Sequence, residues 1–105
     1  MQKFSMVAKF TAKTGAGEAL AGLLLEAGAS VQAIQACEVY IVHRSDTEED
    51  TLWVTEIWTS PEAHAEALAL PETRAAIAKA MPYIAGVEGT RLRPLGGKGL
   101  SLHEL

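Results

Sequence analysis

The segment Leu52-Trp53-Val54-Thr55-Glu56-Ile57-Trp58-Thr59-Ser60-Pro61-Glu62 decides the fold, because it joins a strand directly to a helix. Residues 52–58 are rich in β-branched and aromatic side chains, which favour a strand. Side chains alternate between the two faces of a strand, so this strand carries large apolar groups on both faces. On one face lie Leu52, Val54 and Trp58, and on the other lie Trp53 and Ile57. Both faces of the sheet must therefore be covered.

The residues that follow this strand are typical of the first turn of a helix. Either Thr59 or Ser60 can serve as the N-cap, and Pro61 and the glutamate after it are favoured at the first positions. Pro71 then interrupts the apolar pattern, which resumes and runs to Met81. A kinked or two-part helix is predicted.

The rest of the chain supplies one more helix and three more strands. Residues 4–11 alternate apolar and polar side chains as a strand does, and residues 16–34 carry apolar side chains at the spacings of an amphipathic helix. Residues 37–44 and 87–94 have strand character. The acidic run 45–50 lacks a glycine turn, so we expect a short solvated loop and not a calcium site.

The resulting order, βαββαβ, predicts an α+β fold of ferredoxin-like topology with a four-stranded antiparallel sheet. In this topology the two helices cover only one face of the sheet. The other face would leave a large apolar patch in water, which monomers rarely do. We therefore expect a homodimer in which two sheets pack face to face as a dimeric α+β barrel.

The length of 105 residues, with 49% hydrophobic and 21% charged side chains, fits a single globular domain. We place this domain at residues 1–95 and a C-terminal tail at residues 96–105. The tail begins with glycines and ends in alternating leucines. It either docks on the partner subunit as an added strand or remains a mobile terminus.

Charge and composition exclude several partners. The net charge of −4 and the scattered basic residues argue against nucleic acid. No apolar run approaches the roughly 18 residues that span a bilayer, and the amino terminus lacks the pattern of a signal peptide. The single cysteine, Cys37, cannot form an intrachain disulfide. We therefore expect a cytoplasmic protein without a membrane partner.

The segments Cys37–Tyr40 and Trp53–His64 resemble the antibiotic biosynthesis monooxygenase (ABM) family of the dimeric α+β barrel superfamily. The shared feature is a Glu-x-Trp sequence at a strand end, followed by a capped helix that opens with Glu-Ala. The resemblance extends by element order over residues 3–95. It implies a homodimer with a cavity between sheet and helices in each subunit. Members include cofactor-independent oxygenases of quinols and anthrone-like polyphenols, haem-degrading enzymes and proteins without established chemistry.

The chain departs from the family pattern on the second helix. The family often has His-Leu followed by Pro-His-Phe, where this chain has Ala67-Leu68 and Pro71-Glu72-Thr73, so two frequent histidines are absent. The haem-degrading branch has an asparagine on the first strand and a histidine about ten residues after the tryptophan. Here the first strand has no asparagine, and Leu68 stands ten residues after Trp58. Haem degradation is therefore disfavoured.

His64 is the predicted catalytic residue. It shares a helical stripe with Leu68 and Ala75, and an imidazole with its usual pKa near 6.5 can accept a phenolic proton at neutral pH. The alternative is a half-buried histidine held by a backbone carbonyl or by Glu56. Trp58 either stacks on a flat aromatic substrate or belongs to the core.

Five further residues are predicted to bind the substrate together with His64 and Trp58. Glu56 shares a strand face with Trp58 and needs a partner there, either His64 or Arg91. The further candidates for the wall of the substrate pocket are Leu68, Tyr40, Tyr83 and Arg91. No metal site and no cofactor are expected, because no histidines, cysteines or carboxylates occur at metal-ligand spacing and no glycine-rich nucleotide motif is present.

The resemblance and these residues predict a cofactor-independent monooxygenase that oxidises a small phenol, quinol or polyketide-like aromatic with molecular oxygen. A non-catalytic ligand-binding or stress-related homodimer on the same fold is the alternative. An adaptor that captures proteins through its leucine-bearing tail is a third hypothesis.

Overall fold

The fold follows the predicted order of elements, with the second helix divided in two. The computed structural model describes residues 2–99. The elements are β1 (Phe4–Ala12), α1 (Gly17–Val31), β2 (Cys37–Arg44), β3 (Thr51–Trp58), α2 (Pro61–Leu68), α3 (Pro71–Ala80), a short 3-10 helix η1 (Met81–Tyr83) and β4 (Ile84–Leu92). The predicted docking of the tail falls mainly on residues outside the described range, so it stays a prediction.

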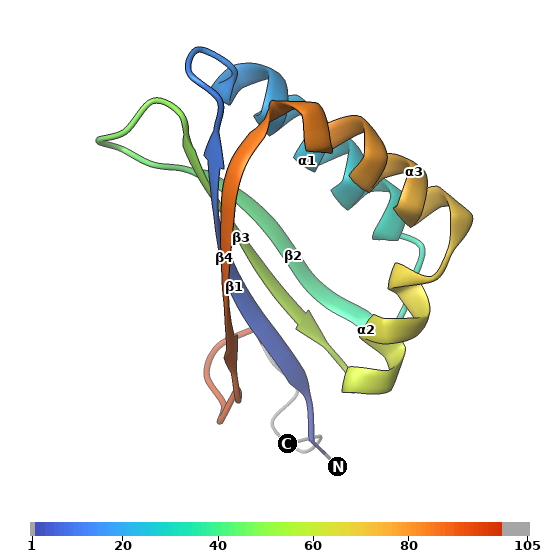
Figure 1. The fold of residues 1–105 in the computed structure, drawn as a ribbon. Helices are drawn as coiled ribbons and strands as arrows, with labels where there is room; N and C mark the ends of the chain where they lie inside the picture. The colour runs from blue at the N-terminus through green and yellow to red at the C-terminus, as the bar shows by residue number, and fades with distance from the viewer. Residues whose placement is uncertain (1, 100–105) are drawn as a thin grey trace.

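The four strands form one antiparallel sheet in the order β2-β3-β1-β4. All three α-helices lie over one face of this curved sheet (Figure 1), which confirms the ferredoxin-like topology. Phe4 lies opposite Trp58, and Met6 lies opposite both Glu56 on β3 and Arg91 on β4. This register places the inward side chains of three strands beside one another. Within residues 2–99 no helix is long and apolar enough to cross a membrane.

The junction between β3 and α2 resolves the predicted N-cap. Ser60 is the cap: its hydroxyl accepts a 3.0 Å hydrogen bond from the backbone N–H of Ala63, and Pro61 takes the first helical position. Leu70 has an extended backbone because the ring of Pro71 disfavours a helical conformation of the residue before it. The chain therefore starts a new helix at Pro71, as the sequence predicted.

Helix α1 is shorter than the predicted range of 16–34. It ends at Val31, and two successive turns follow, with N–H donors at Ile34 and Cys37 bonding to the carbonyls of Val31 and Ile34. Ile34 still packs against the core from this turn. Ile34 continues the apolar spacing of α1, so the predicted helix was drawn too long, although the backbone at Ile34 is not helical.

The acidic loop before β3 includes one residue that stabilises the fold. The carboxylate of Asp50 accepts hydrogen bonds from the backbone N–H groups of Gly15 at 3.0 Å and Gly17 at 2.9 Å. It thus satisfies free N–H donors at the start of α1. A side chain at position 17 would lie 2.6 Å from the carbonyl of Glu49, so only glycine permits this close approach.

The core consists of two groups of buried side chains beneath the helices. One group, toward the loop that joins β2 to β3, contains Leu20, Leu24, Leu52 and Val54. The other, near α2, contains Phe4, Val31, Trp58 and Ala67. Both groups lie between the sheet and the helices, and the hollow beside them contains the candidate site.

Candidate active site

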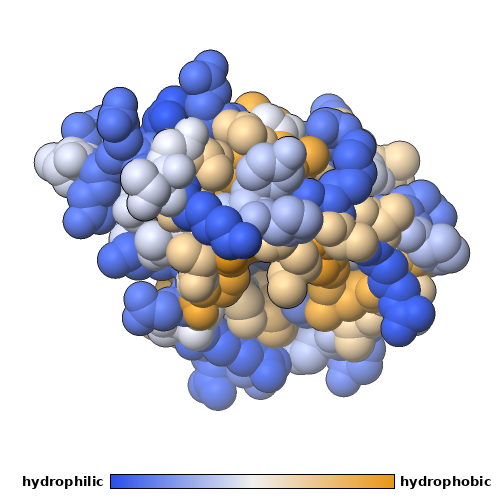
Figure 2. All heavy atoms as spheres, turned by 45° about the horizontal axis from the view of Figure 1, so that its top comes forward, coloured by the Kyte–Doolittle hydropathy of each residue, from blue (hydrophilic) through white to orange (hydrophobic). Residues whose placement is uncertain are grey.

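A largely apolar cavity of about 300 Å³ lies between the sheet and the helices. Members of both core groups line it, among them Leu24, Val31 and Trp58. The exposed apolar residues at its rim are Leu68, Ile77, Met81 and Val87. On the face shown in Figure 2, apolar residues gather across the middle and hydrophilic residues surround them. The cavity has the size and character of a small-molecule site.

His64 stands in the wall of this cavity, near the start of α2. Its ring stacks on Phe4, with centroids 4.2 Å apart and an angle of 17° between the planes. It also meets Trp58 edge to face at 5.5 Å. Only 16% of its side chain is exposed. These aromatic contacts hold the imidazole in place while it borders the hollow.

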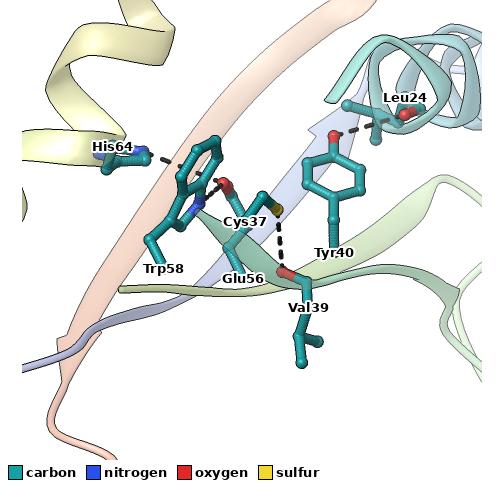
Figure 3. A network of polar contacts seen from close by, with 7 residues as sticks. All are labelled: Leu24, Cys37, Val39, Tyr40, Glu56, Trp58 and His64. Carbon is teal, nitrogen blue, oxygen red and sulfur yellow. Dashed lines mark hydrogen bonds and ion pairs between the residues drawn. The ribbon is translucent and has the colours of Figure 1, made fainter. Parts of the chain in front are cut away.

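Glu56 connects His64 to Trp58. Its Oε1 atom accepts a 2.9 Å hydrogen bond from the indole N–H of Trp58 and lies 3.9 Å from Nε2 of His64 (Figure 3). The buried indole N–H needs an acceptor, and Glu56 supplies it from two residues earlier on the same strand face. Of the two partners predicted for Glu56, the structure provides His64 and adds Trp58.

The surroundings of His64 favour its neutral form. Burial lowers the pKa of His64 from its usual value, Glu56 raises it, and Arg91 lowers it. The guanidinium of Arg91 lies 4.9 Å from the centre of the Phe4 ring, on which His64 is stacked. Because burial is the largest of these effects, the pKa of His64 lies below its usual value, which favours the neutral imidazole that can accept a proton.

The family model for antibiotic biosynthesis monooxygenases matches residues 3–79, the part of the chain that contains this site. The chain belongs to the ABM family. The crystal structure of a protein from Chloroflexus aurantiacus J-10-fl that carries the same family name is 33% identical, with a TM-score of 0.85 over 94% of this chain and 99% of that one.

Two other solved structures are similar to this ABM domain. One, from Caulobacter crescentus CB15, also carries the family name and is 26% identical, with a TM-score of 0.84 over 90% of this chain and 92% of that one. The other is a variant of SnoaB, a cofactor-independent oxygenase from Streptomyces nogalater; it is 15% identical, with a TM-score of 0.81 over 93% and 98%. At that identity the likeness shows the fold alone. No match was found among curated proteins.

Five of the seven residues predicted for the ABM site meet at the cavity. His64, Glu56, Trp58, Tyr40 and Leu68 all line it. Tyr83 and Arg91 are absent from its described lining. Tyr83 is exposed and its carbonyl accepts a hydrogen bond from Lys13, whereas Arg91 lies over the Phe4 ring.

Tyr40 and Cys37 are not suited to act as bases at neutral pH. Burial raises the pKa of the Tyr40 phenol well above its usual range, and Glu56 raises it further. Burial and Glu56 likewise raise the pKa of the Cys37 thiol to about 11. Of Tyr40, Cys37 and His64, only His64 is therefore suited to accept a proton near pH 7.

Several lining residues were not predicted from the sequence. Among them are Phe10, Leu23, Ala76, Ile77, Met81 and Ile84. The apolar period of the helices and of the first strand indicated an inward face, but it does not separate residues that pack from residues that border a hollow. Thr73 also lines the cavity, in the segment where the family often has Pro-His-Phe. Within residues 2–99, no three histidine, cysteine or acidic side chains are grouped as a metal site would require.

Proposed function

We propose that this ABM protein is a cofactor-independent monooxygenase that oxidises a small phenol, quinol or polyketide-like aromatic with molecular oxygen. The observation that carries this proposal is the position of His64 beside Glu56 in the wall of an otherwise apolar cavity. SnoaB, a cofactor-independent oxygenase, has the same fold, so the fold is compatible with this chemistry.

The proposed reaction begins when Nε2 of His64 accepts the proton of a substrate hydroxyl. The substrate anion then transfers one electron to O2, which gives a substrate radical and superoxide. These radicals combine at a ring carbon that carries hydrogen, and the peroxide takes the proton back from His64. Loss of water from the hydroperoxide leaves a carbonyl group. One oxygen atom ends in the product and the other in water, and the substrate supplies all the electrons.

Glu56 and the apolar wall have separate parts in this scheme. Glu56 stabilises the imidazolium that forms when His64 accepts the proton, because its carboxylate lies 3.9 Å from Nε2. The apolar lining excludes water, which favours collapse of the radical pair over its escape. Trp58 offers an aromatic surface beside the substrate ring.

Oxygen consumption tests this proposal. The protein is incubated in air with a panel of hydroquinones, dihydroxynaphthalenes and anthrones, and oxygen uptake and quinone formation are followed. We expect His64→Ala to lower kcat roughly 100- to 10,000-fold, the usual contribution of a general base. The matched control is His43→Ala, because His43 lies on the opposite sheet face, away from the cavity. Uptake at the buffer rate on every substrate, or full activity in His64→Ala, contradicts the proposal.

A non-catalytic ligand-binding protein is the second candidate function. It is favoured by the second helix, where Ala67 lines the cavity at one of the two positions at which the family often has histidine. Calorimetric binding of the same aromatic panel without oxygen uptake would support this alternative.

We also propose that the protein is a homodimer formed through the open face of the sheet. Three large apolar side chains are exposed on that face: Ile41 (48%), Trp53 (37%) and Leu92 (47%). Exposed apolar side chains gathered on one sheet face favour packing against a second copy.

A further inference from the structure

Tyr40 separates the cavity from a second hollow on the other side of its ring. This hollow, called here the outer groove, has a volume of about 410 Å³ and lies along α1 and the edge strand β2. Its lining comprises Leu25, Gly28, Gln32, Cys37, Glu38 and Val42, together with Val31 and Tyr40. Val31 and Tyr40 also line the cavity, so these two side chains form the partition between the two spaces.

Two contacts with α1 hold the Tyr40 ring in this partition. The phenol hydroxyl donates a 3.4 Å hydrogen bond to the carbonyl of Leu24 (Figure 3). The ring also packs directly against Gly28, where a Cβ atom would lie 2.9 Å from two ring carbons. Glycine inside a helix costs about 1 kcal/mol relative to alanine. The close approach of Tyr40 is a physical reason for glycine at this position.

Tyr40 also borders the proposed reacting end of the cavity. It lies directly opposite Glu56 across the β2–β3 pair, and both side chains face the helices. A ligand hydroxyl held between Glu56 and His64 therefore has the Tyr40 ring beside it. Val31 belongs to the buried core, whereas Tyr40 is only half-buried, so Tyr40 is the part of the partition that can be changed with less damage to the fold.

We propose that Tyr40 determines the size of the aromatic ligand, by closing the cavity against the outer groove. This inference rests on the proposed function, because it assumes that the cavity holds a phenolic ligand. Removal of the ring joins the two hollows and gives a ligand tail new space beyond position 40. A side chain at position 28 has the opposite effect, because it pushes the Tyr40 ring toward the cavity.

A series of 4-alkylphenols measures directly the longest tail that the cavity accepts, called here the tail-length limit. Binding is followed by calorimetry under nitrogen, so that no turnover occurs, with tails that grow by one methylene at a time. Affinity is expected to rise roughly fourfold per buried methylene until the tail meets the partition, and then to level off. In Tyr40→Ala the rise continues for at least two further methylenes, which makes the longest phenols bind roughly 15-fold tighter relative to the wild-type protein. Tyr40→Phe keeps the ring and should keep the wild-type limit.

Cys37 reports where the tail lies. It is the only cysteine of the chain and it lines the outer groove, so its modification by excess N-ethylmaleimide at mildly alkaline pH, slow because its pKa is raised, reports on that groove. Mass spectrometry should show that a long alkylphenol slows modification in Tyr40→Ala and leaves the rate unchanged in the wild-type protein. Gly28→Ala provides an independent variant, in which the affinity is expected to level off at a shorter tail.

The outcomes separate the two proposals. If no alkylphenol binds the wild-type protein, both the proposed function and the role of Tyr40 are rejected. If phenols bind but Tyr40→Ala and Gly28→Ala both retain the wild-type limit, only the role of Tyr40 is rejected. An extended limit in Tyr40→Ala with protection of Cys37, or a shortened limit in Gly28→Ala, supports it.

Discussion

The indole N–H of Trp58 and the carboxylate of Glu56 are joined by a 2.9 Å hydrogen bond within one strand. Trp58 is only 2% exposed, so this bond fixes Glu56 against a side chain that cannot easily move. The same carboxylate oxygen lies 3.9 Å from Nε2 of His64. The proton affinity of His64 therefore depends on a charge whose position is set by the core.

Glu56→Gln is expected to lower the pKa of His64 further. Glutamine still accepts the hydrogen bond from Trp58, but the negative charge that raises the pKa of His64 is lost. A base acts in its neutral form, so the acid limb of kcat/KM should move to lower pH. The rate at the plateau should fall about fivefold, because the imidazolium loses a partly exposed ion pair. NMR titration of His64 and pH–rate profiles measure both effects; an unchanged or higher His64 pKa contradicts the role given to Glu56.

Arg91→Gln should change the pKa of His64 in the opposite direction. The guanidinium lies over Phe4 and lowers the pKa of His64, so its removal raises that pKa and moves the acid limb of kcat/KM to higher pH. The matched control is Arg93→Gln, because Arg93 is also exposed and no effect of it on His64 is seen. Equal NMR titration curves of His64 in Arg91→Gln and Arg93→Gln would show that the guanidinium over Phe4 does not affect the pKa of His64.

The order of elements could be predicted from the sequence because strand and helix periods are local patterns. The inward positions of Glu56 and Trp58 follow from strand alternation alone. Their hydrogen bond could not be predicted, because it depends on the side-chain conformations of two residues on the same face. The end of α1 was also missed, since Ile34 continues the apolar spacing into a turn.

The position of Arg91 depends on a relationship between distant strands. Its place over Phe4 follows from the pairing of β4 with β1, in which Arg91 lies opposite Met6. The register of that pair shifts between Thr11 and Ala12. Spacing along the chain contains no information about this shift, so the sequence alone could not separate Arg91 from the residues that line the cavity.

Asp50→Ala is expected to destabilise the fold by about 1 to 2 kcal/mol. The change removes an acceptor for two N–H groups at the start of α1, and loss of a helix cap has this cost. Asp50→Asn should cost less, because its amide oxygen still accepts one of the bonds. Urea denaturation measures the free energy of unfolding, with Asp46→Ala as the control from the exposed part of the same loop. Equal stability of the Asp50→Ala and Asp46→Ala variants would show that Asp50 is not a cap.

Trp53→Glu is expected to convert the proposed homodimer into a monomer. Trp53 lies on the open face of the sheet, opposite Lys9 on β1, and a carboxylate there would be buried against a second sheet in the dimer. Sedimentation at micromolar concentration should give twice the 11.2 kDa chain mass for the wild-type protein and 11.2 kDa for the variant. Leu25→Glu is the control, because Leu25 is 60% exposed on α1, on the helical side of the sheet, and its change should leave the dimer intact. A wild-type species of 11.2 kDa would mean that the open face is not a dimer interface, since its apolar side chains would then remain in water.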